Sequence, residues 1–368
     1  MPIASLSKKI ITFFLSRKVA ITLLILMTAL LVLSSQLPDI NAMDEDMRLF
    51  YQEDRSFSYN FSKTFGGTGI IASPWFYVLP VFIFLSTLIC TIERLIRKKR
   101  KDIGFWGSMI FHAGLLSIII AAIITKVTLF EGEVLLTEGY TFPLGREGYL
   151  RISRNPDSGI TLPEGTITMT KYKNIYQGDF AIDHEASITI DRGGIPLETE
   201  IKVNHPLEVD DLQYTLNKYG FAPAFVVKDD KGEVLVDAFI NLVVVQGKED
   251  SFAVPGKNTM IYVRFHPDFE MTDDGPRSKS RLPNNPVVAV KVKRWGKESR
   301  FLHIKLGSSA NIMGFNIAFP ELKYWAHFLV KRDKGIPVFI FAFFLVVGGL
   351  SIRFLTMKQS VKGEERKV

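Results

Sequence analysis

Hydrophobic and polar positions along this 368-residue chain follow two different patterns. Four stretches are almost uninterrupted in apolar residues over the roughly 20 residues that a helix needs to cross a bilayer. They predict transmembrane helices at residues 19–37, 75–92, 105–125 and 336–355. Between the third and fourth stretches, residues 126–335 form short alternating runs rich in Val, Ile, Thr and Tyr, which is typical of antiparallel strands.

Turn residues divide the alternating region into strands. The segments DRGG and DDKGE lie between alternating runs and predict tight hairpin turns. We expect a β sandwich or an open barrel. One polar segment, HPDFEMTDDGPRSKSRLPNNP, predicts an exposed loop between strands. The predicted fold class is therefore an α+β membrane protein with four transmembrane helices and one large β-rich domain.

Positive charge in the short loops indicates orientation, because Lys and Arg beside a span resist translocation. The turn at residues 93–104 is strongly basic, whereas the loop at residues 38–74 is acidic. The bases of the turn are Arg94, Arg97, Lys98, Lys99, Arg100 and Lys101. This pattern predicts that residues 1–18, the basic turn and the tail 356–368 are cytoplasmic. The acidic loop and the β-rich domain are then extracytoplasmic, in a multi-pass protein of the inner (cytoplasmic) membrane.

Composition narrows the possible partners. The formal net charge is +7, but the bases gather beside the apolar runs, so we expect them to meet lipid headgroups of the bilayer, not nucleic acid. The one cysteine, Cys90, lies in a span, which excludes disulfides and thiol chemistry from the β-rich domain. In residues 1–18, Leu6, Ile10, Phe13 and Phe14 recur at helical spacing. They fit an interfacial helix or an early start of the first span.

The β-rich domain shows no catalytic motif: it lacks GxSxG, HExxH and a phosphate loop. Its five histidines are scattered on predicted turns or strand edges, without metal-ligand spacing. They are His184, His205, His266, His303 and His327. We interpret them as surface or structural residues, and we expect no catalytic residue in this chain.

His112 is the one ionisable residue inside the third apolar run, GFWGSMIFHAGLLSIIIAAII. A polar side chain in hydrocarbon costs a few kcal/mol and usually has a partner or a ligand. Two interpretations remain open on this ground: a hydrogen bond to a neighbouring helix, or axial ligation of haem iron by a neutral imidazole.

Small residues divide the third span into two faces. Gly107, Gly114 and Ala121 share one stripe at helical spacing, which favours close packing of helices. At 100° per residue, His112 points about 140° away from that stripe. We therefore expect the stripe to pack against this chain's own spans, and His112 to face a cofactor shared with a second membrane protein.

Several blocks resemble the ResB family of cytochrome c biogenesis proteins over nearly the whole chain. SRKVAITLLILMTALLVLSSQLP is similar to the family's first span, SPWFYVLPVFIFLSTLICTIERLIRK to its second, and WGSMIFHAGLLSIIIAAIITKVTLFEGEVLLTEGYTF to its third. An external element is matched by Asn204, Pro206, Leu207, Tyr219 and Gly220. The segment before the last span resembles the family's Asp-Pro-Gly, except that Lys334 stands where proline is usual.

The resemblance implies a role in System II maturation, in which haem is carried outward and joined to apocytochrome c. It implies a ResC/CcsA-type membrane partner and transiently shared haem b, with His112 as one axial ligand and a partner histidine as the other. The chain lacks the partner's tryptophan-rich motif and would be a non-catalytic subunit of a cytochrome c haem lyase complex. One alternative is a scaffold that binds no haem. Another is a b-type electron carrier, but such a carrier normally needs two transmembrane histidines, and this chain has one.

Overall fold

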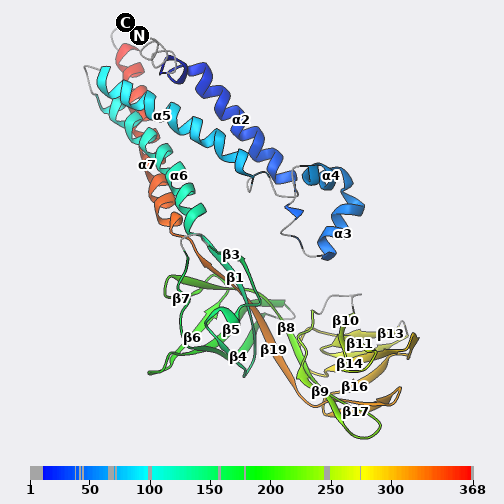
Figure 1. Cartoon of the computed structure of the whole chain (residues 1–368). Helices are drawn as coiled ribbons and strands as arrows, with labels where there is room; N and C mark the ends of the chain where they lie inside the picture. The colour runs from blue at the N-terminus through cyan, green and yellow to red at the C-terminus, as the bar shows by residue number, and fades with distance from the viewer. Residues whose placement is uncertain are drawn as a thin grey trace. The chain divides into compact units, whose positions relative to one another are not determined.

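The computed structural model describes residues 11–37, 39–40, 43, 45–64, 70, 73–97, 102–155, 159–177, 180–243, 249–273 and 275–365. The chain forms two compact units (Figure 1). Unit 1 comprises the described parts of Met1–Leu129 and Asp333–Val368 and is helical. Unit 2 comprises Phe130–Asn155 and Gly159–Arg332 and is built from strands.

Unit 1 contains four helices that are long and apolar enough to cross a membrane, which confirms the predicted number. They are α2 (Arg17–Gln36), α5 (Val78–Arg97), α6 (Ile103–Thr128) and α7 (Gly335–Glu365). Their ends differ from the apolar runs. Residues Pro74–Tyr77 form a 3-10 turn, η3, before α5, and α7 continues past Leu355 to Glu365. Bilayer thickness limits the apolar run, but it does not stop a helix from continuing into polar sequence.

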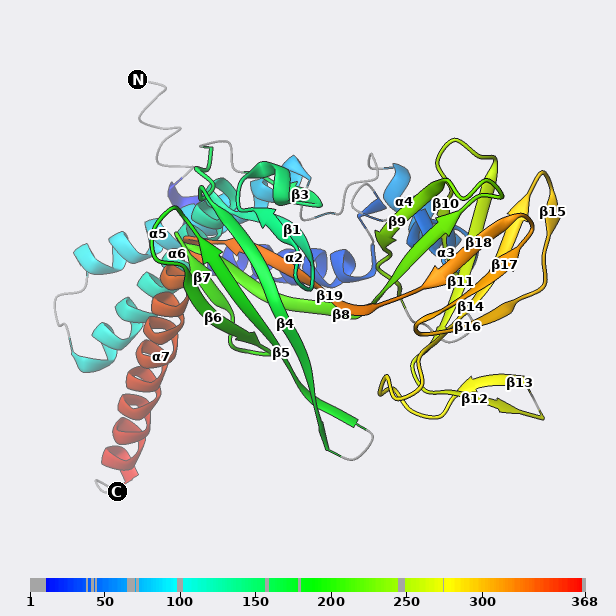
Figure 2. The same ribbon diagram turned by 90° about the horizontal axis from the view of Figure 1, so that it is seen from below.

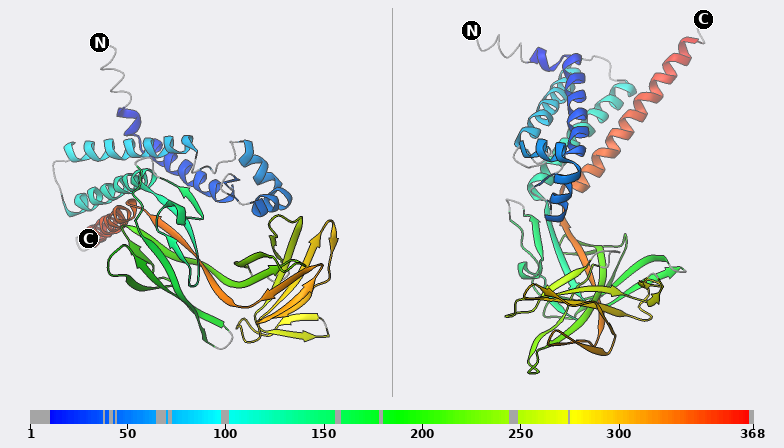
Figure 3. Two further views of the ribbon diagram at one scale, coloured as in Figure 1. Left: turned by 60° about the horizontal axis from the view of Figure 1, so that its bottom comes forward. Right: turned by 90° about the vertical axis from the view of Figure 1, so that its right-hand side faces the viewer.

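The helices α6 and α7 lie side by side in Figures 1 and 3, because small residues line their contact. A Cβ atom at Gly107 would lie 2.9 Å from the backbone nitrogen of Arg353, and one at Gly114 would lie 2.8 Å from that of Val346. The stripe predicted from helical spacing therefore faces α7. Backbones this close gain dispersion contacts that larger residues would prevent.

The helix α5 contacts both α2 and α6. Ser86 of α5 donates a hydrogen bond to the carbonyl oxygen of Phe14 at 3.0 Å, and the Phe14 side chain is buried. Of the predicted interfacial helix, Leu6 and Ile10 lie outside the described residues. The described part is one helical turn at residues 11–14, which ends before α2 begins.

The acidic loop contains two helices that the apolar pattern did not predict, α3 (Glu45–Asp54) and α4 (Ser56–Thr64). The Phe57 side chain is 79% exposed, and its ring stacks on Phe61 with centroids 6.0 Å apart. Because apolar and charged residues are mixed in this loop, its mean hydropathy concealed the helices.

A short turn joins the strands to α7. Asp333 Oδ1 accepts hydrogen bonds from Gly335 N and from Thr125 Oγ1 of α6, both at 2.8 Å. A Cβ atom at Gly335 would lie 2.6 Å from the carbonyl oxygen of Ala121, so only glycine fits. Lys334 between them is exposed, which explains how the turn forms without proline at that position.

The strands of unit 2 pair antiparallel throughout the described part. They are β1 (Phe130–Thr137), β2 (Thr141–Pro143), β3 (Arg151–Arg154), β4 (Thr166–Gln177), β5 (Phe180–Asp191), β6 (Leu197–Lys202), β7 (Leu207–Val209), β8 (Leu212–Lys228), β9 (Val234–Phe239), β10 (Asp250–Ala253), β11 (Thr259–His266), β12 (Phe269–Thr272), β13 (Gly275–Ser278), β14 (Val287–Arg294), β15 (Lys297–Glu298), β16 (Leu302–Lys305), β17 (Ser308–Ile312), β18 (Phe315–Phe319) and β19 (Leu322–Arg332), with a 3-10 turn, η4 (Arg146–Gly148). This confirms the predicted antiparallel β domain. The segment predicted as an exposed loop forms the hairpin β12–β13 instead, because Thr272 and Gly275 pair around a tight turn.

The largest sheet has the order β17-β18-β8-β19-β1-β3, and β7 and β9 also pair with β8. A second sheet, β2-β4-β5-β6, packs on its first half, and a third, β10-β11-β14-β15 with β16 on β14, packs on its second half. Strand β8 supplies Leu212 and Tyr214 to the first hydrophobic core and Phe225 and Val227 to the second. Figure 2 shows β8 and β19 running through both halves. Each half of the domain therefore consists of two packed β layers, and the two halves share long strands.

Candidate functional site

Two helices of unit 1 position His112. Asp102 begins α6 by accepting a hydrogen bond from Phe105 N at 2.6 Å, and His112 lies on the face of α6 that meets α5. The two helices approach near the end of α5 and diverge toward its start (Figure 1). His112 is half-buried at this approach.

A chain of two hydrogen bonds fixes the imidazole. His112 Nδ1 lies 2.9 Å from Thr91 Oγ1, and the same hydroxyl donates to the carbonyl oxygen of Thr87 at 2.6 Å. A hydroxyl group has one proton, and Thr91 gives it to Thr87. In a neutral imidazole, Nδ1 must then be the donor to Thr91, and the lone pair lies on Nε2. In the part of the chain that the structure describes, Nε2 has no hydrogen-bond partner.

The structure confirms one sequence interpretation of His112, the hydrogen bond to a neighbouring helix, and it places the side chain against α5 of this chain and not away from the chain's own spans. Axial ligation of haem iron stays a prediction. Nδ1 makes the hydrogen bond to a neighbouring helix, and Nε2 is free to bind a metal. Metal-ligating histidines usually donate their second N–H to a protein oxygen, which fixes the tautomer and the ring orientation. The donor set therefore fits an axial ligand of haem iron.

A second polar contact between α5 and α6 lies one turn away. Arg94 Nη1 donates to Ser108 Oγ at 2.9 Å, and Ser108 is buried. Thr91 and Arg94 are three residues apart on α5, and Ser108 and His112 are four apart on α6, so both contacts lie on one seam. No ion pair joins Arg94 to a carboxylate within the described residues. Its positive charge is available to an anionic group of a ligand near His112.

Sequence reasoning missed Thr91 and placed Arg94 only in the basic turn. Hydroxyl groups are common in spans and usually bond to their own helix, as Thr91 also does with Thr87. Which face of α5 meets His112 depends on how the two helices pack. A hydroxyl three residues before an arginine near the end of a span was the one available signal.

Among the five histidines of unit 2, the predicted position of His327 was wrong. It lies in the central strand β19, 9% exposed. Its Nε2 is 3.1 Å from Glu133 Oε2, and its Nδ1 is 3.2 Å from Asn217 Nδ2. His184 Nδ1 lies 2.7 Å from Asn174 Oδ1. His205 lies in the turn before β7, as predicted.

His266 and His303 lie near one another, at the end of β11 and in β16, with ring centroids 6.4 Å apart. Burial lowers the pKa of both imidazoles, and the proximity of His303 lowers the pKa of His266 further. Within the described residues, no group of three or more His, Cys, Asp or Glu side chains could hold a metal ion.

Known proteins resemble this chain over much of its length. The family described as "ResB-like family" matches residues 99–361, more than half of the chain. A curated relative, "Cytochrome c biogenesis protein CcsB" of Gloeobacter violaceus, is 24% identical over 275 residues. The alignment covers 73% of this chain and 54% of the relative, so the chain spans about half the length of the protein it matches.

Among solved structures, the chain is similar to "Cytochrome c Heme Lyase CcmF" with 12% sequence identity and a TM-score of 0.26. That similarity covers 74% of this chain and 30% of the other. A TM-score below 0.5 does not indicate a shared fold.

Proposed function

Because the chain belongs to the ResB-like family, we propose that it is a membrane component of cytochrome c maturation. In this role it acts with a ResC/CcsA-type membrane protein to deliver haem outward for attachment to apocytochrome c. The chain is the non-catalytic subunit of that complex. The name of its curated relative, a cytochrome c biogenesis protein, supports the proposal.

The observation that carries the proposal is the free Nε2 of His112. The hydrogen bond from Nδ1 to Thr91 orients the ring and leaves the Nε2 lone pair as the ligating group. We propose that this lone pair is one axial ligand of haem b, which supplies the iron–protoporphyrin group that the pathway attaches. His112 holds this cargo through one bond and can release it.

Arg94 supports a ligand of this chemical class. Haem has carboxylate side chains, and a guanidinium group without a carboxylate partner can pair with one of them. Its hydrogen bond to Ser108 would keep the guanidinium group on the α5–α6 seam. The role that we propose for Arg94 is to hold the porphyrin edge while His112 ligates the iron.

The second iron ligand comes from the partner in this proposal. The sequences of α2, α5 and α7 contain no histidine, so His112 is the one imidazole that the four helices can offer. A b-type electron carrier normally holds its haem between two transmembrane histidines, and this chain lacks the second. Shared ligation instead makes haem binding depend on assembly with the partner.

The orientation follows from the charge pattern. We propose that the basic turn at residues 93–104 faces the cytoplasm of a cell whose inner membrane holds the four helices. Residues 126–335 are then extracytoplasmic, on the side where apocytochrome c is matured. The Arg94 end of α5 lies toward the cytoplasm, where haem is made available.

The decisive experiment purifies the chain together with its ResC/CcsA-type partner and records the haem spectrum. We expect His112→Ala to abolish most of the Soret absorbance, and His112→Gly to regain it when imidazole is added. His327→Ala is the control, because it removes a buried imidazole outside the spans and should leave the spectrum unchanged. Full absorbance and normal cytochrome c assembly in His112→Ala would instead support the scaffold alternative.

Arg94 has its own test in the same complex. We expect Arg94→Gln to weaken haem retention during washing, because it removes the charge and retains hydrogen-bonding capacity. Arg97→Gln is the matched control, since Arg97 is exposed and pairs with Glu93 on its own helix. Equal loss of haem from both variants would show that general positive charge, and not Arg94, is responsible.

A further inference from the structure

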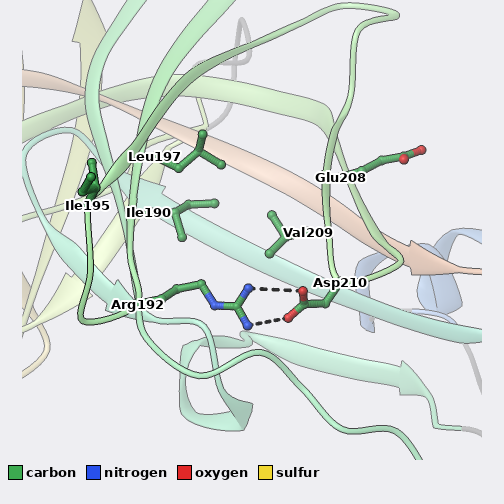
Figure 4. Close-up of a pocket in the computed structure, with 7 residues that line it drawn as sticks. All are labelled: Ile190, Arg192, Ile195, Leu197, Glu208, Val209 and Asp210. Atoms are coloured by element: carbon green, nitrogen blue, oxygen red, sulfur yellow. Dashed lines mark hydrogen bonds and ion pairs between the residues drawn. The ribbon is translucent and has the colours of Figure 1, made fainter.

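A pocket of about 220 Å³ opens at one end of the first hydrophobic core of unit 2 (Figure 4). Two core residues line it, Ile190 of β5 and Val209 of β7. Ile195 and Leu197 line another wall, and they are 99% and 52% exposed. The pocket therefore has an apolar wall that reaches the core and a charged rim formed by Arg192, Glu208 and Asp210.

A bidentate ion pair lies at the opening of the pocket. Arg192 Nη2 and Nη1 lie 2.6 Å and 3.2 Å from the two carboxylate oxygens of Asp210. Asp210 and Asp211 both have positive φ, at 49° and 66°, as in the two-residue turn that joins β7 to β8. The pair thus connects the β5–β6 turn to the β7–β8 turn, as the dashed lines in Figure 4 show.

The size of the pocket limits what it can hold. Cofactor and drug sites usually measure about 300–1,000 Å³, so this pocket is too small for a haem. It is larger than the roughly 150 Å³ of an apolar cavity that accepts benzene. One apolar side chain of a partner fits this range.

Backbone groups beside the pocket are available for pairing. In the described part of the sheet, β6 pairs along its length only with β5, and β7 pairs only with β8. The chain passes from β6 to β7 through a bridge between Lys202 and His205. The pocket lies at the opposite ends of these strands, beside Leu197 and Val209. A free strand edge is a template for an extended polypeptide.

Side chains on β6 define the pattern that such a polypeptide needs. Ile201 points into the core, and Leu197, four residues earlier, lines the pocket on the same face. Glu198 and Glu200 point to the other face and are exposed, and Glu200 pairs with Lys202 of the same face at 3.2 Å. Glu208 of β7 adds a third carboxylate at the pocket. A strand added beside β6 would place alternate side chains against an apolar face and against the face that carries Glu198.

We propose that the free edge of β6 binds an extended, basic polypeptide segment in which apolar and positively charged residues alternate. One apolar side chain enters the pocket, and the basic side chains lie beside Glu198 and Glu208. The main chain of the segment forms a ladder with β6. This site is independent of His112 and of haem, so either proposal can fail without the other.

The test uses the purified full chain in detergent and a fluorescent nine-residue peptide of alternating lysine and valine. We expect saturable binding by anisotropy that empty micelles do not show. Replacing the valines by serine or the lysines by glutamate should weaken binding at least tenfold. Equal binding of the serine peptide would reduce the site to a non-specific acidic surface and overturn the proposal, as would no binding of the original peptide.

Variants locate the site on the chain. We expect Leu197→Asp to weaken binding of the lysine–valine peptide at least tenfold, because it places a charge at the pocket wall. The matched control is Val234→Asp on β9, since Val234 is an exposed apolar residue at 51%. It should change the affinity less than twofold. Equal effects of the two variants would overturn the assignment to β6.

The charge requirement has a separate pair of variants. We expect Glu198→Lys combined with Glu208→Lys to reduce affinity at least tenfold, with a smaller difference at high salt because exposed charges are screened. Asp230→Lys combined with Glu233→Lys makes the same change in charge at the β8–β9 turn. If this control loses as much affinity as the double variant, the carboxylates beside the pocket are not the binding site.

Discussion

Thr91 controls the ring nitrogen that His112 offers, and Thr91→Val tests this directly. The variant keeps the shape of the side chain but removes the oxygen that accepts from Nδ1 at 2.9 Å. A hydrogen bond of this kind contributes about 1 kcal/mol net, which is roughly fivefold in an equilibrium constant. Loss of a hydrogen-bond partner that orients a metal-ligating histidine costs about 10- to 100-fold in metal affinity, because orientation and tautomer are lost together. We expect haem affinity to fall about tenfold, at the lower end of that range.

The assay is haem titration of the co-purified complex, followed by Soret absorbance. Thr91→Ser retains the hydroxyl and should bind haem as the wild-type chain does. Thr87→Val is the matched control, because Thr87 takes part only through its carbonyl oxygen, which the substitution leaves in place. Unchanged affinity in Thr91→Val, or an equal loss in Thr87→Val, would refute the reasoning from the tautomer.

Three further predictions concern stability, measured as thermal unfolding of the detergent-solubilised chain. Gly114→Ala should destabilise the α6–α7 pair by about 1–3 kcal/mol through overpacking, whereas Gly348→Ala, where an added Cβ meets nothing within 4 Å, should cost nothing. Asp333→Ala should lower the free energy of unfolding by about 1 kcal/mol, because it removes the acceptor at the start of α7. Asp333→Asn should retain most of that stability. Burial lowers the pKa of His266 and His303 below 6.5, so the stability that depends on their neutral imidazoles is complete above pH 6.5 and is lost as pH falls through the folded-state pKa. The double variant His266→Asn/His303→Asn should lose less stability on acidification than the wild-type chain, and an equal loss would contradict this.

The sequence contained enough information to find the four helices and the antiparallel β domain, because both follow from the spacing of apolar residues. It also indicated that the face of α6 with Gly107 and Gly114 packs against another span of this chain, although it did not indicate that this span is α7. It could not indicate the contact between Thr91 and His112. That contact depends on the rotation of α5 about its axis, which is set by packing at residues such as Phe14 and Ser86.

The β domain was predictable as a class but not in its division into two cores. Alternation identifies each strand, yet it does not say that β8 serves one core through Tyr214 and another through Phe225. The Tyr219–Gly220 element, recognised first as a family resemblance, has a packing reason. A Cβ at Gly220 would lie 2.6 Å from the Trp325 ring, whose Nε1 donates to the carbonyl oxygen of Leu242 at 2.9 Å. Such a contact between distant strands leaves no periodic signal.

The two ends of unit 2 meet each other. Phe130 begins β1, Arg332 ends β19, and these residues are register partners. On the membrane side, Thr125 and Gly335 bring the end of α6 to the start of α7. The chain ends at the junction therefore pair within each unit, and the β domain is an insertion between the two helices of a hairpin. A change within the β domain that keeps this junction therefore leaves in place the glycine contacts that hold the hairpin together.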